Sequence, residues 1–248
     1  MSRTRKVIGM GETIMDIIFR NGQPQAAVHG GSSFNSIVSV GRAGVPCVFV
    51  GDTGADIVGR QTLDFMRANH VGTDYCPMRP DVKSAVSLAY LDDNGDASYV
   101  FYKQKPEAPK EWTLPQIDAD DVLLYGSYFA SCRGMRPLVE DMLSHATAGG
   151  AIIYYDINFR SSHSHELEAL LPTIEDNCRR SSIVRGSADD FEVLFGERDA
   201  ATIYDRHIRK LCPVFICTSG AGAVTVCLPH DTLRFPVPRV EDVASTVG

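Results

Sequence analysis

Polar side chains that suit a polyhydroxylated ligand follow the predicted strands of this chain or begin its first predicted helix. They are Asp16, Asn35, Asp156, Asn158 and Arg160. In an open α/β sheet, ligands gather beyond the carboxyl ends of the strands. Each ligand hydroxyl needs a donor and an acceptor once it leaves water, and carboxylates, amides and a guanidinium supply both. These residues therefore indicate a binding site for a small polyhydroxylated molecule.

A second set of residues suits an anion or a nucleotide. Thr218 follows a predicted strand and begins the sequence TSGAG, which contains Gly220 and Gly222. Small residues of this kind let a phosphate approach bare backbone N–H groups. The same residues also fit a tight turn between strands. A solvated turn residue is an equally good interpretation of Asp16. For Arg160, an ion pair with Asp156 or Glu166 is an equally good interpretation.

The residues from His29 to Val45 place a glycine pair against a strongly patterned helix. Gly30 and Gly31 lack a Cβ, so another molecule can come close to the backbone there. Ser32 and Ser33 are suitable N-cap residues. Helical spacing predicts one packed face, made of Phe34, Ile37, Val38 and Gly41.

The elements that must position these residues alternate between strand and helix. Strands are predicted at residues 6–10, 47–50, 122–125, 151–155, 182–184 and 214–217, with further strands at 223–228 and 233–237. Helices are predicted between them, including one that Ser187 caps and Asp190 closes as a capping box. This alternation predicts a parallel sheet with crossover helices. Two hairpins interrupt it, at 14–29 with a turn at Asn21 and Gly22, and at 84–102 with a turn at residues 93–95.

Composition and charge exclude several classes of protein. A net charge of −7 and the absence of a long basic run argue against a nucleic-acid partner. The stretch MSRTRKVIGMGE lacks the apolar core expected of a signal peptide, and no apolar run in the sequence is long enough to span a membrane. Seven cysteines without a C-x-x-C pair indicate reduced thiols, with Cys47, Cys217 and Cys227 in the core. We therefore expect a cytoplasmic protein. A dinucleotide fingerprint near Gly9 fails, because Ile14 stands where a glycine is needed.

Five motifs in order resemble those of the ribokinase, or PfkB-type, carbohydrate kinase family. They are G-x-G-E-x-x-x-D at 9–16, G-G-x-x-x-N at 30–35, D-x-N-x-R at 156–160, T-x-G-x-G at 218–222 and the terminal STVG. The resemblance covers essentially the whole chain. D-x-N-x-R and the segment YVFYK, at 99–103, resemble the fructokinase and 2-keto-3-deoxygluconate kinase branch of this family.

The resemblance implies a Rossmann-like, mostly parallel α/β sheet flanked by helices, with a small β-sheet lid. The α/β core would comprise residues 1–13, 33–82 and 106–248, and the lid residues 14–32 and 83–105. It also implies transfer of a phosphoryl group from ATP, with Mg²⁺, to a hydroxyl of a ketose such as fructose or of a keto-sugar acid. A homodimer formed through the lid is implied as well.

The resemblance assigns roles by motif position. Sugar binding is assigned to Asp16, Gly30, Gly31, Asn35, Asp156 and Asn158, and the distal end of the substrate to Tyr90, Tyr102, Lys103 and Arg160. Nucleotide binding is assigned to Ser187, Asp189, Thr218, Gly220 and Gly222, and an anion hole to Thr246 and Gly248.

Two departures from the family pattern affect the chemistry. The family's N-x-x-E element, which organises Mg²⁺, has Ala188 and Phe191 at its polar positions here, so the metal ligands stay unknown, with Asp189, Asp190 or Glu192 as substitutes. The STVG motif starts the anion hole, but Gly248 precedes the aspartate that acts as general base. We expect the natural protein to continue beyond Gly248, and the residues shown to be inactive without that aspartate.

Two further functions are compatible with the same fold. A non-catalytic protein that binds a sugar or a nucleotide is favoured by Ala188 and by the missing base. A nucleoside kinase is the other, although its base pocket would be more apolar than Lys103 and Arg160 suggest.

Overall fold

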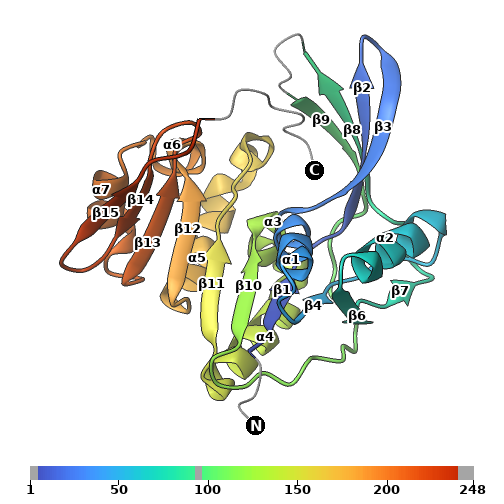
Figure 1. Cartoon of the computed structure of the whole chain (residues 1–248), viewed down its shortest axis with the longest axis horizontal. Helices are drawn as coiled ribbons and strands as arrows, with labels where there is room; N and C mark the ends of the chain where they lie inside the picture. The colour runs from blue at the N-terminus through green and yellow to red at the C-terminus, as the bar shows by residue number, and fades with distance from the viewer. Residues whose placement is uncertain (1–4, 93–96, 240–248) are drawn as a thin grey trace. The chain divides into compact units, whose positions relative to one another are not determined.

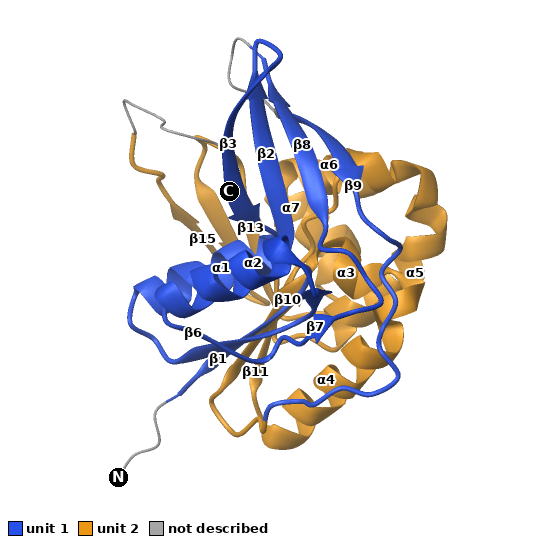
Figure 2. Cartoon of the chain, turned by 90° about the vertical axis from the view of Figure 1, so that its right-hand side faces the viewer, with its two compact units in different colours: residues 1–115, 240–248 blue, residues 116–239 orange. Residues whose placement is uncertain are grey.

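The computed structural model describes residues 5–92 and 97–239. They form two compact units, one reaching Pro115 and the other running from Gln116 to Arg239 (Figure 2). Each unit contains parallel strands with helices packed on them, as the alternation in the sequence predicts.

The α/β part of the first unit is built on three parallel strands in the order β1, β4, β6. They are β1 (Val7–Met10), β4 (Cys47–Val50) and β6 (Val71–Tyr75). Helix α1 (Ser32–Arg42) packs against β1 and β4, and α2 (Ile57–Ala68) packs against β6. Two short strands, β5 (Thr53–Gly54) and β7 (Met78–Arg79), pair with each other.

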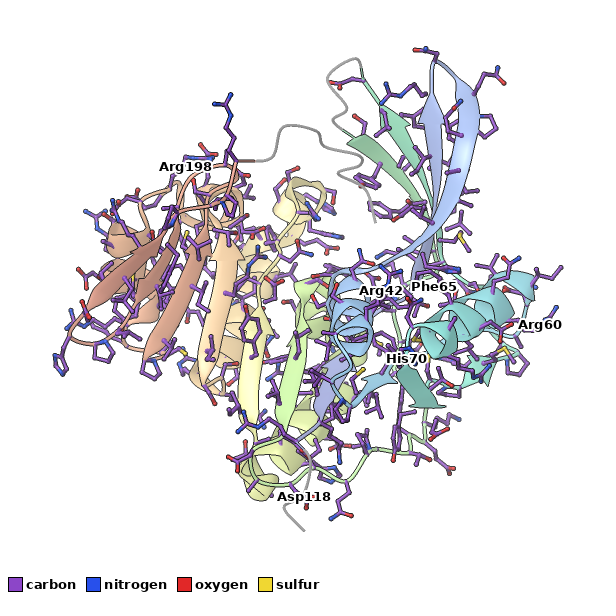
Figure 3. All side chains as sticks on the ribbon, in the orientation of Figure 1. Arg42, Arg60, Phe65, His70, Asp118 and Arg198 are labelled. Atoms are coloured by element: carbon purple, nitrogen blue, oxygen red, sulfur yellow. The ribbon has the colours of Figure 1, made fainter. Side chains whose placement is uncertain are left out.

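The packed face of α1 is the one that its spacing predicts. Phe34, Ile37, Val38 and Gly41 are all buried. A Cβ at Gly9 of β1 would come within 2.9 Å of the Ile37 Cβ, so glycine lets the helix lie directly on the strand. Where α1 meets α2, the guanidinium of Arg42 lies 5.7 Å from the centre of the Phe65 ring, and both residues are labelled in Figure 3.

The N-cap of α1 differs from the prediction. The cap residue is Gly31 rather than Ser32 or Ser33, and no side chain caps the helix. Gly31 has φ 122°, a conformation that favours glycine, and a Cβ there would overlap the carbonyl oxygen of Glu12. The close approach of these two backbone segments therefore sets the first residue of the helix, which serine spacing alone does not reveal.

The two predicted hairpins join into one small sheet, whose strands lie side by side in Figure 1. The first hairpin pairs β2 (Ile14–Arg20) with β3 (Gln23–Gly30), and the second pairs β8 (Val86–Leu91) with β9 (Ala97–Tyr102). The order is β3, β2, β8, β9, with β2 and β8 parallel. Asn21 and Gly22 form the first turn, as predicted, with positive φ values of 52° and 72°. The second predicted turn, at 93–95, lies outside the described residues.

The second unit contains four parallel strands and two antiparallel strands in the order β10 to β15. The parallel strands are β10 (Val122–Gly126), β11 (Ile152–Asp156), β12 (Ile183–Ser187) and β13 (Val214–Thr218). The antiparallel strands are β14 (Val224–Cys227) and β15 (Thr232–Phe235). Its α-helices are α3 (Ser127–Ser131), α4 (Arg136–Gly149), α5 (Leu167–Arg179), α6 (Ala188–Phe195) and α7 (Ala200–Ile203), with one-turn segments η1 (Arg133–Met135), η2 (Ser161–Glu166) and η3 (Tyr204–Ile208).

The ends of two helices of this unit can be compared with the capping and proline signals in the sequence. Helix α6 begins with the predicted capping box of Ser187 and Asp190 and ends at Gly196 in the left-handed conformation. Helix α5 runs past Pro172 to Arg179, although the proline predicts a kink or an early end. Pro172 has no N–H to donate to the Glu168 carbonyl. Both residues are exposed, so water can donate to that carbonyl instead.

The burial of three cysteines agrees with the sequence prediction. All seven cysteines are unpaired and buried, Cys47, Cys217 and Cys227 among them. Among residues 5–92 and 97–239, no helix has both the length and the apolar character needed to cross a bilayer.

Replacing Phe34 by alanine should destabilise the first unit by about 3–5 kcal/mol, because its fully buried ring packs against Phe49 and Phe65. Urea unfolding followed by circular dichroism measures this loss. Ile57→Ala is the control, since Ile57 is 65% exposed and its loss should change stability by less than about 0.5 kcal/mol. Equal losses in the two variants would contradict the proposed core.

Candidate functional site

In the first unit, the carboxylate of Asp16 is buried within the small sheet. Asp16 lies on β2 opposite Val28 of β3 and Ser87 of β8, and is 7% exposed. The hydroxyl of Ser87 donates a hydrogen bond to Asp16 Oδ1. A Cβ at Gly30 would overlap Asp16 Oδ2, so the glycine pair makes room for this carboxylate. The structure thus brings Asp16 and Gly30 together, as the sequence predicts for an acceptor site.

The electrostatics of Asp16 are those of an incompletely solvated acid. Burial raises its pKa above the ordinary value of 3.8, the Ser87 hydrogen bond lowers it, and the negative charge of Glu12 raises it. Among the described residues, Ser87 provides the single hydrogen bond that this carboxylate accepts. The carboxylate therefore retains capacity for further donors, such as ligand hydroxyls.

Asn35 lies in the first turn of α1, four residues after Gly31. Its backbone N–H donates to the Gly31 carbonyl at 2.9 Å, and the residue is half-buried. In the part of the chain that the structure describes, the side-chain amide of Asn35 has no protein hydrogen-bond partner. Gly31 and Asn35 thus share one helix start, where an amide and a bare backbone are both available.

Three of the four residues predicted for the distal end of the substrate lie on β8, on β9 or directly after it, whereas Arg160 follows β11 in the second unit. Lys103 Nζ forms an ion pair with Glu12 Oε2 at 2.8 Å, and both side chains are largely buried. Tyr90 stacks on Phe19 with ring centres 5.0 Å apart, whereas Tyr102 is 61% exposed. Because Glu12 offsets the charge of Lys103, the pair presents a polar surface rather than a lone cation.

In the second unit, an arginine that sequence analysis missed connects two predicted site residues. Arg185 Nη1 donates to both oxygens of Asp156, at 2.9 and 3.2 Å, and Arg185 Nη2 donates to Thr218 Oγ1 at 2.9 Å. Burial raises the pKa of Asp156, and the charge of Arg185 lowers it. Arg160, offered as a partner of Asp156 from the sequence, is exposed and forms no ion pair with it. The sequence feature that could have identified Arg185 is a cation within the strand sequence SSIVRGS.

The D-x-N-x-R segment leaves β11 with strained backbone geometry. Asn158 has φ 37°, which is uncommon for a residue other than glycine, between the buried side chains of Ile157 and Phe159. The Ile157 N–H donates to the Arg185 carbonyl at 2.9 Å, which fixes this segment to β12. Such strain is frequent at ligand sites.

The two positions that the sequence assigns to the Mg²⁺ element are apolar and buried. Ala188 and Phe191 are both buried in the core, so neither position can organise an ion. Ser187 and Asp190 have the same spacing and lie at the start of α6, where the Ser187 N–H and hydroxyl donate to Asp190 Oδ2 at 2.6 and 2.8 Å. Asp189 instead pairs with Arg198 at 2.7 Å.

The acids near the predicted metal element are already engaged by other protein groups, which limits how they can bind a divalent cation. Arg185 offsets Asp156, Arg198 offsets Asp189, and Asp190 is engaged in the capping box. No group of three histidine, cysteine or acidic residues within 5–92 and 97–239 has the arrangement of a metal site. These residues fit a Mg²⁺ ion whose ligands come mostly from phosphate and water, which is the usual way proteins bind this ion.

The turn after β13 is tight and exposed. The Gly222 N–H donates to the Ser219 carbonyl at 2.7 Å, and Gly220 has φ 51° with open space where a Cβ would be. Ser219 and Gly220 are exposed, so their N–H groups are accessible to an anion. A tight turn and a nucleotide site are therefore compatible here. The predicted anion hole at Thr246 and Gly248 lies outside the described residues.

Comparison with known proteins decides the family. Residues 5–248 match the model of the pfkB family of carbohydrate kinases. The chain belongs to this family. The resemblance seen in the motifs is confirmed, and so is the predicted α/β fold with a mostly parallel sheet and a small separate sheet.

This pfkB family member is similar to several proteins named as kinases. It is 29% identical to the aminoimidazole riboside kinase of Salmonella typhimurium, over 100% of this chain and 78% of that protein. It is 27% identical to a fructokinase of Rhizobium leguminosarum bv. trifolii, over 98% and 75% of the two chains.

Two solved structures have closely similar folds. The aminoimidazole riboside kinase of Salmonella enterica, complexed with aminoimidazole riboside and an ATP analogue, has a TM-score of 0.83 and 25% identity, over 97% of this chain and 79% of that one. The fructokinase of Vibrio cholerae O395, bound to fructose, ADP and calcium, has a TM-score of 0.83 at 21% identity, over 96% and 78%. The second likeness shows the fold alone.

Asp16→Asn in this pfkB family member should raise stability at pH 7. Folding raises the Asp16 pKa, so the ionised carboxylate costs stability above that pKa, and this cost vanishes as the pH falls below 3.8. Urea midpoints of the variant and the wild type should differ at pH 7 and converge toward pH 3.8. Asp64→Asn, at an exposed residue, is the control and should change stability at pH 7 by less than about 0.5 kcal/mol. A less stable Asp16→Asn at pH 7 would contradict this electrostatic account.

Arg185→Gln should destabilise the second unit by about 1–3 kcal/mol, because it leaves the Asp156 carboxylate, 14% exposed, without its charged donor. Adding Asp156→Asn should recover much of that loss, since no buried charge then remains. A double-mutant cycle from urea unfolding measures the coupling. Arg179→Gln, which removes an exposed pair with Glu175, should cost less than about 0.5 kcal/mol. Strictly additive losses would show that Asp156 and Arg185 are not coupled.

Proposed function

We propose that this protein transfers the terminal phosphoryl group of ATP to a hydroxyl of a sugar. The observation that carries the proposal is the carboxylate of Asp16, which is buried and accepts one hydrogen bond from the described residues. A buried acceptor of this kind gains stability from ligand hydroxyls that donate to it. Membership of the pfkB family supports the same conclusion.

Most of the acceptor side of the proposed reaction belongs to the first unit. Asp16 accepts hydrogen bonds from sugar hydroxyls, and Gly30 and Gly31 let the ligand lie close to the backbone. The free amide of Asn35 donates to one hydroxyl and accepts from another. Since phosphoryl transfer depends mainly on positioning and charge stabilisation, the task of these residues is to hold one hydroxyl in a fixed orientation.

The nucleotide side belongs to the second unit. We assign the phosphates to the exposed N–H groups after Thr218. The guanidinium of Arg185 donates to the Thr218 hydroxyl and lies near these groups. Ser187 and Asp189 stay candidates for the same ligand, at the start of α6. When bound, Mg²⁺ would neutralise phosphate charge, and the acids described above would act on it through water. The proton acceptor for the attacking hydroxyl is assigned to none of the described residues.

A ketose or a keto-sugar acid is the proposed acceptor. Arg160 is exposed beyond β11 and available to an acidic or polar distal group, whereas Glu12 already offsets Lys103. The fructokinases among the relatives favour fructose. An aminoimidazole riboside is the second candidate, because a kinase for that compound is 29% identical over the full chain and exposed aromatic rings such as Tyr102 are available to stack on a base.

We further propose that the protein is a cytoplasmic homodimer that pairs through its small sheet. Four consecutive apolar or aromatic residues on β9, Tyr99 to Tyr102, are between 41% and 61% exposed, which is costly for a monomer in water. The unpaired state of all seven thiols suits a reducing compartment.

Turnover with a panel of acceptors tests the proposal. The protein, expressed from its complete reading frame, is incubated with ATP, Mg²⁺ and either fructose, 2-keto-3-deoxygluconate or aminoimidazole riboside, and ³¹P NMR detects any phosphate ester. We expect an ester from fructose or the keto-sugar acid, with the highest kcat/KM for one of them. Preference for the riboside would favour the nucleoside kinase. Binding of sugar and ATP without any ester would favour a non-catalytic protein and overturn the kinase proposal.

A further inference from the structure

A second pocket lies in the second unit, away from the residues assigned to the nucleotide. Its volume is about 200 Å³, and it is enclosed by α5, the end of α6 and the segment from Arg206 to Leu211. None of the proposed phosphate ligands, such as Thr218 or Gly220, lines it. The described contacts leave this pocket without a role in the proposed kinase reaction.

The interior of the pocket is apolar. Ile157, Ile174 and Ile208 line it, and each is no more than 2% exposed. Phe195 and His207 also line the pocket, and their rings stack on each other with centres 3.9 Å apart and nearly parallel planes. An apolar cavity of about 150 Å³ accommodates benzene in another protein, so a body the size of one ring fits here.

The rim of the pocket is positively charged. Arg206 and Lys210 line it and are exposed, and within the described residues neither side chain forms an ion pair or a hydrogen bond. Glu175 also lines the pocket, but Arg179 Nη2 donates to it at 3.0 Å and offsets its charge. Two uncompensated cations beside an apolar cavity contrast with the net charge of −7 for the chain.

The backbone that carries these cations is a π-helical turn. The Arg209 N–H donates to the Tyr204 carbonyl, five residues earlier, at 2.8 Å. This wider turn is rare and often occurs at functional sites. It is the segment that supplies Arg206 and His207 to the pocket and leads directly to Lys210.

We infer that this pocket is a binding site for a small amphipathic anion, with an apolar body the size of one ring and a single carboxylate or phosphate group. The body packs beside the Phe195 and His207 rings, over the three covered isoleucines, and the anionic group meets Arg206 and Lys210. The occupant lies next to Ile157, which stands between Asp156 and Asn158. Binding in the pocket therefore affects the segment that contains Asp156 and Asn158, two of the proposed site residues. The inference rests on the pocket alone and does not require the kinase reaction.

Titration of the ¹⁵N-labelled protein with benzoate, followed by NMR, tests the inference. We expect saturable shifts of the His207 and Leu211 amides, without matching shifts of Ser219 and Gly220 in the phosphate turn. Arg206→Gln and Lys210→Gln should each weaken benzoate about twofold to fivefold, and the double variant about tenfold. Uncharged benzyl alcohol should bind more weakly than benzoate to the wild type.

Arg209→Gln is the matched control, because this neighbouring arginine pairs with Asp205 at 3.0 Å and does not line the pocket. It should leave the benzoate affinity unchanged. No saturable shift at His207 and Leu211, shifts confined to Ser219 and Gly220, or an unchanged affinity in the double variant would each overturn the inference. Loss of kinase activity would not bear on it, so its failure is distinguishable from failure of the proposed function.

Discussion

A carboxylate removed from water and given one hydrogen-bond donor is the constraint on which the acceptor site depends. Asp16 and Ser87 are 71 residues apart, and the parallel pairing of β2 with β8 brings them together. Burial without full hydrogen bonding is unfavourable, so the fold carries a cost that a ligand can relieve. Gly30, across the hairpin, completes the arrangement by leaving the second carboxylate oxygen uncovered by a side chain. In our proposal, the small sheet therefore serves sugar binding as well as architecture.

The elements that the sequence predicted well have local signals. The packed face of α1 follows from the spacing of Phe34 and Ile37, and the ends of α6 follow from Ser187, Asp190 and Gly196. Apolar runs between turn residues located the parallel strands except β6 (Val71–Tyr75), which the sequence did not predict, and alternating residues located the two hairpins. In each case a periodic pattern or a cap within a few residues determines the structure. The order of the motifs then led to the correct family.

What the sequence did not predict depends on contacts between distant segments. The N-cap of α1 is set by the approach of Gly31 to Glu12, and the ion pair of Lys103 with Glu12 spans 91 residues. Arg185 meets Asp156 and Thr218 only because three strands are neighbours in the sheet. Burial excludes Ala188 from contact with an ion and leaves Ser187 partly exposed, which spacing alone does not reveal. Local patterns carry no information on such pairings.

The central claim is that Asp16 holds the sugar. Isothermal titration calorimetry of the accepted sugar, on the wild type and on Asp16→Asn, tests it most directly at pH 7. Hydrogen bonds to a charged group contribute about 1.5–3 kcal/mol, so the variant should bind the sugar at least about tenfold more weakly. Its affinity for an ATP analogue should stay the same, because the nucleotide residues belong to the other unit. Equal sugar affinity in the two proteins would contradict the assignment of Asp16 and the account built on it.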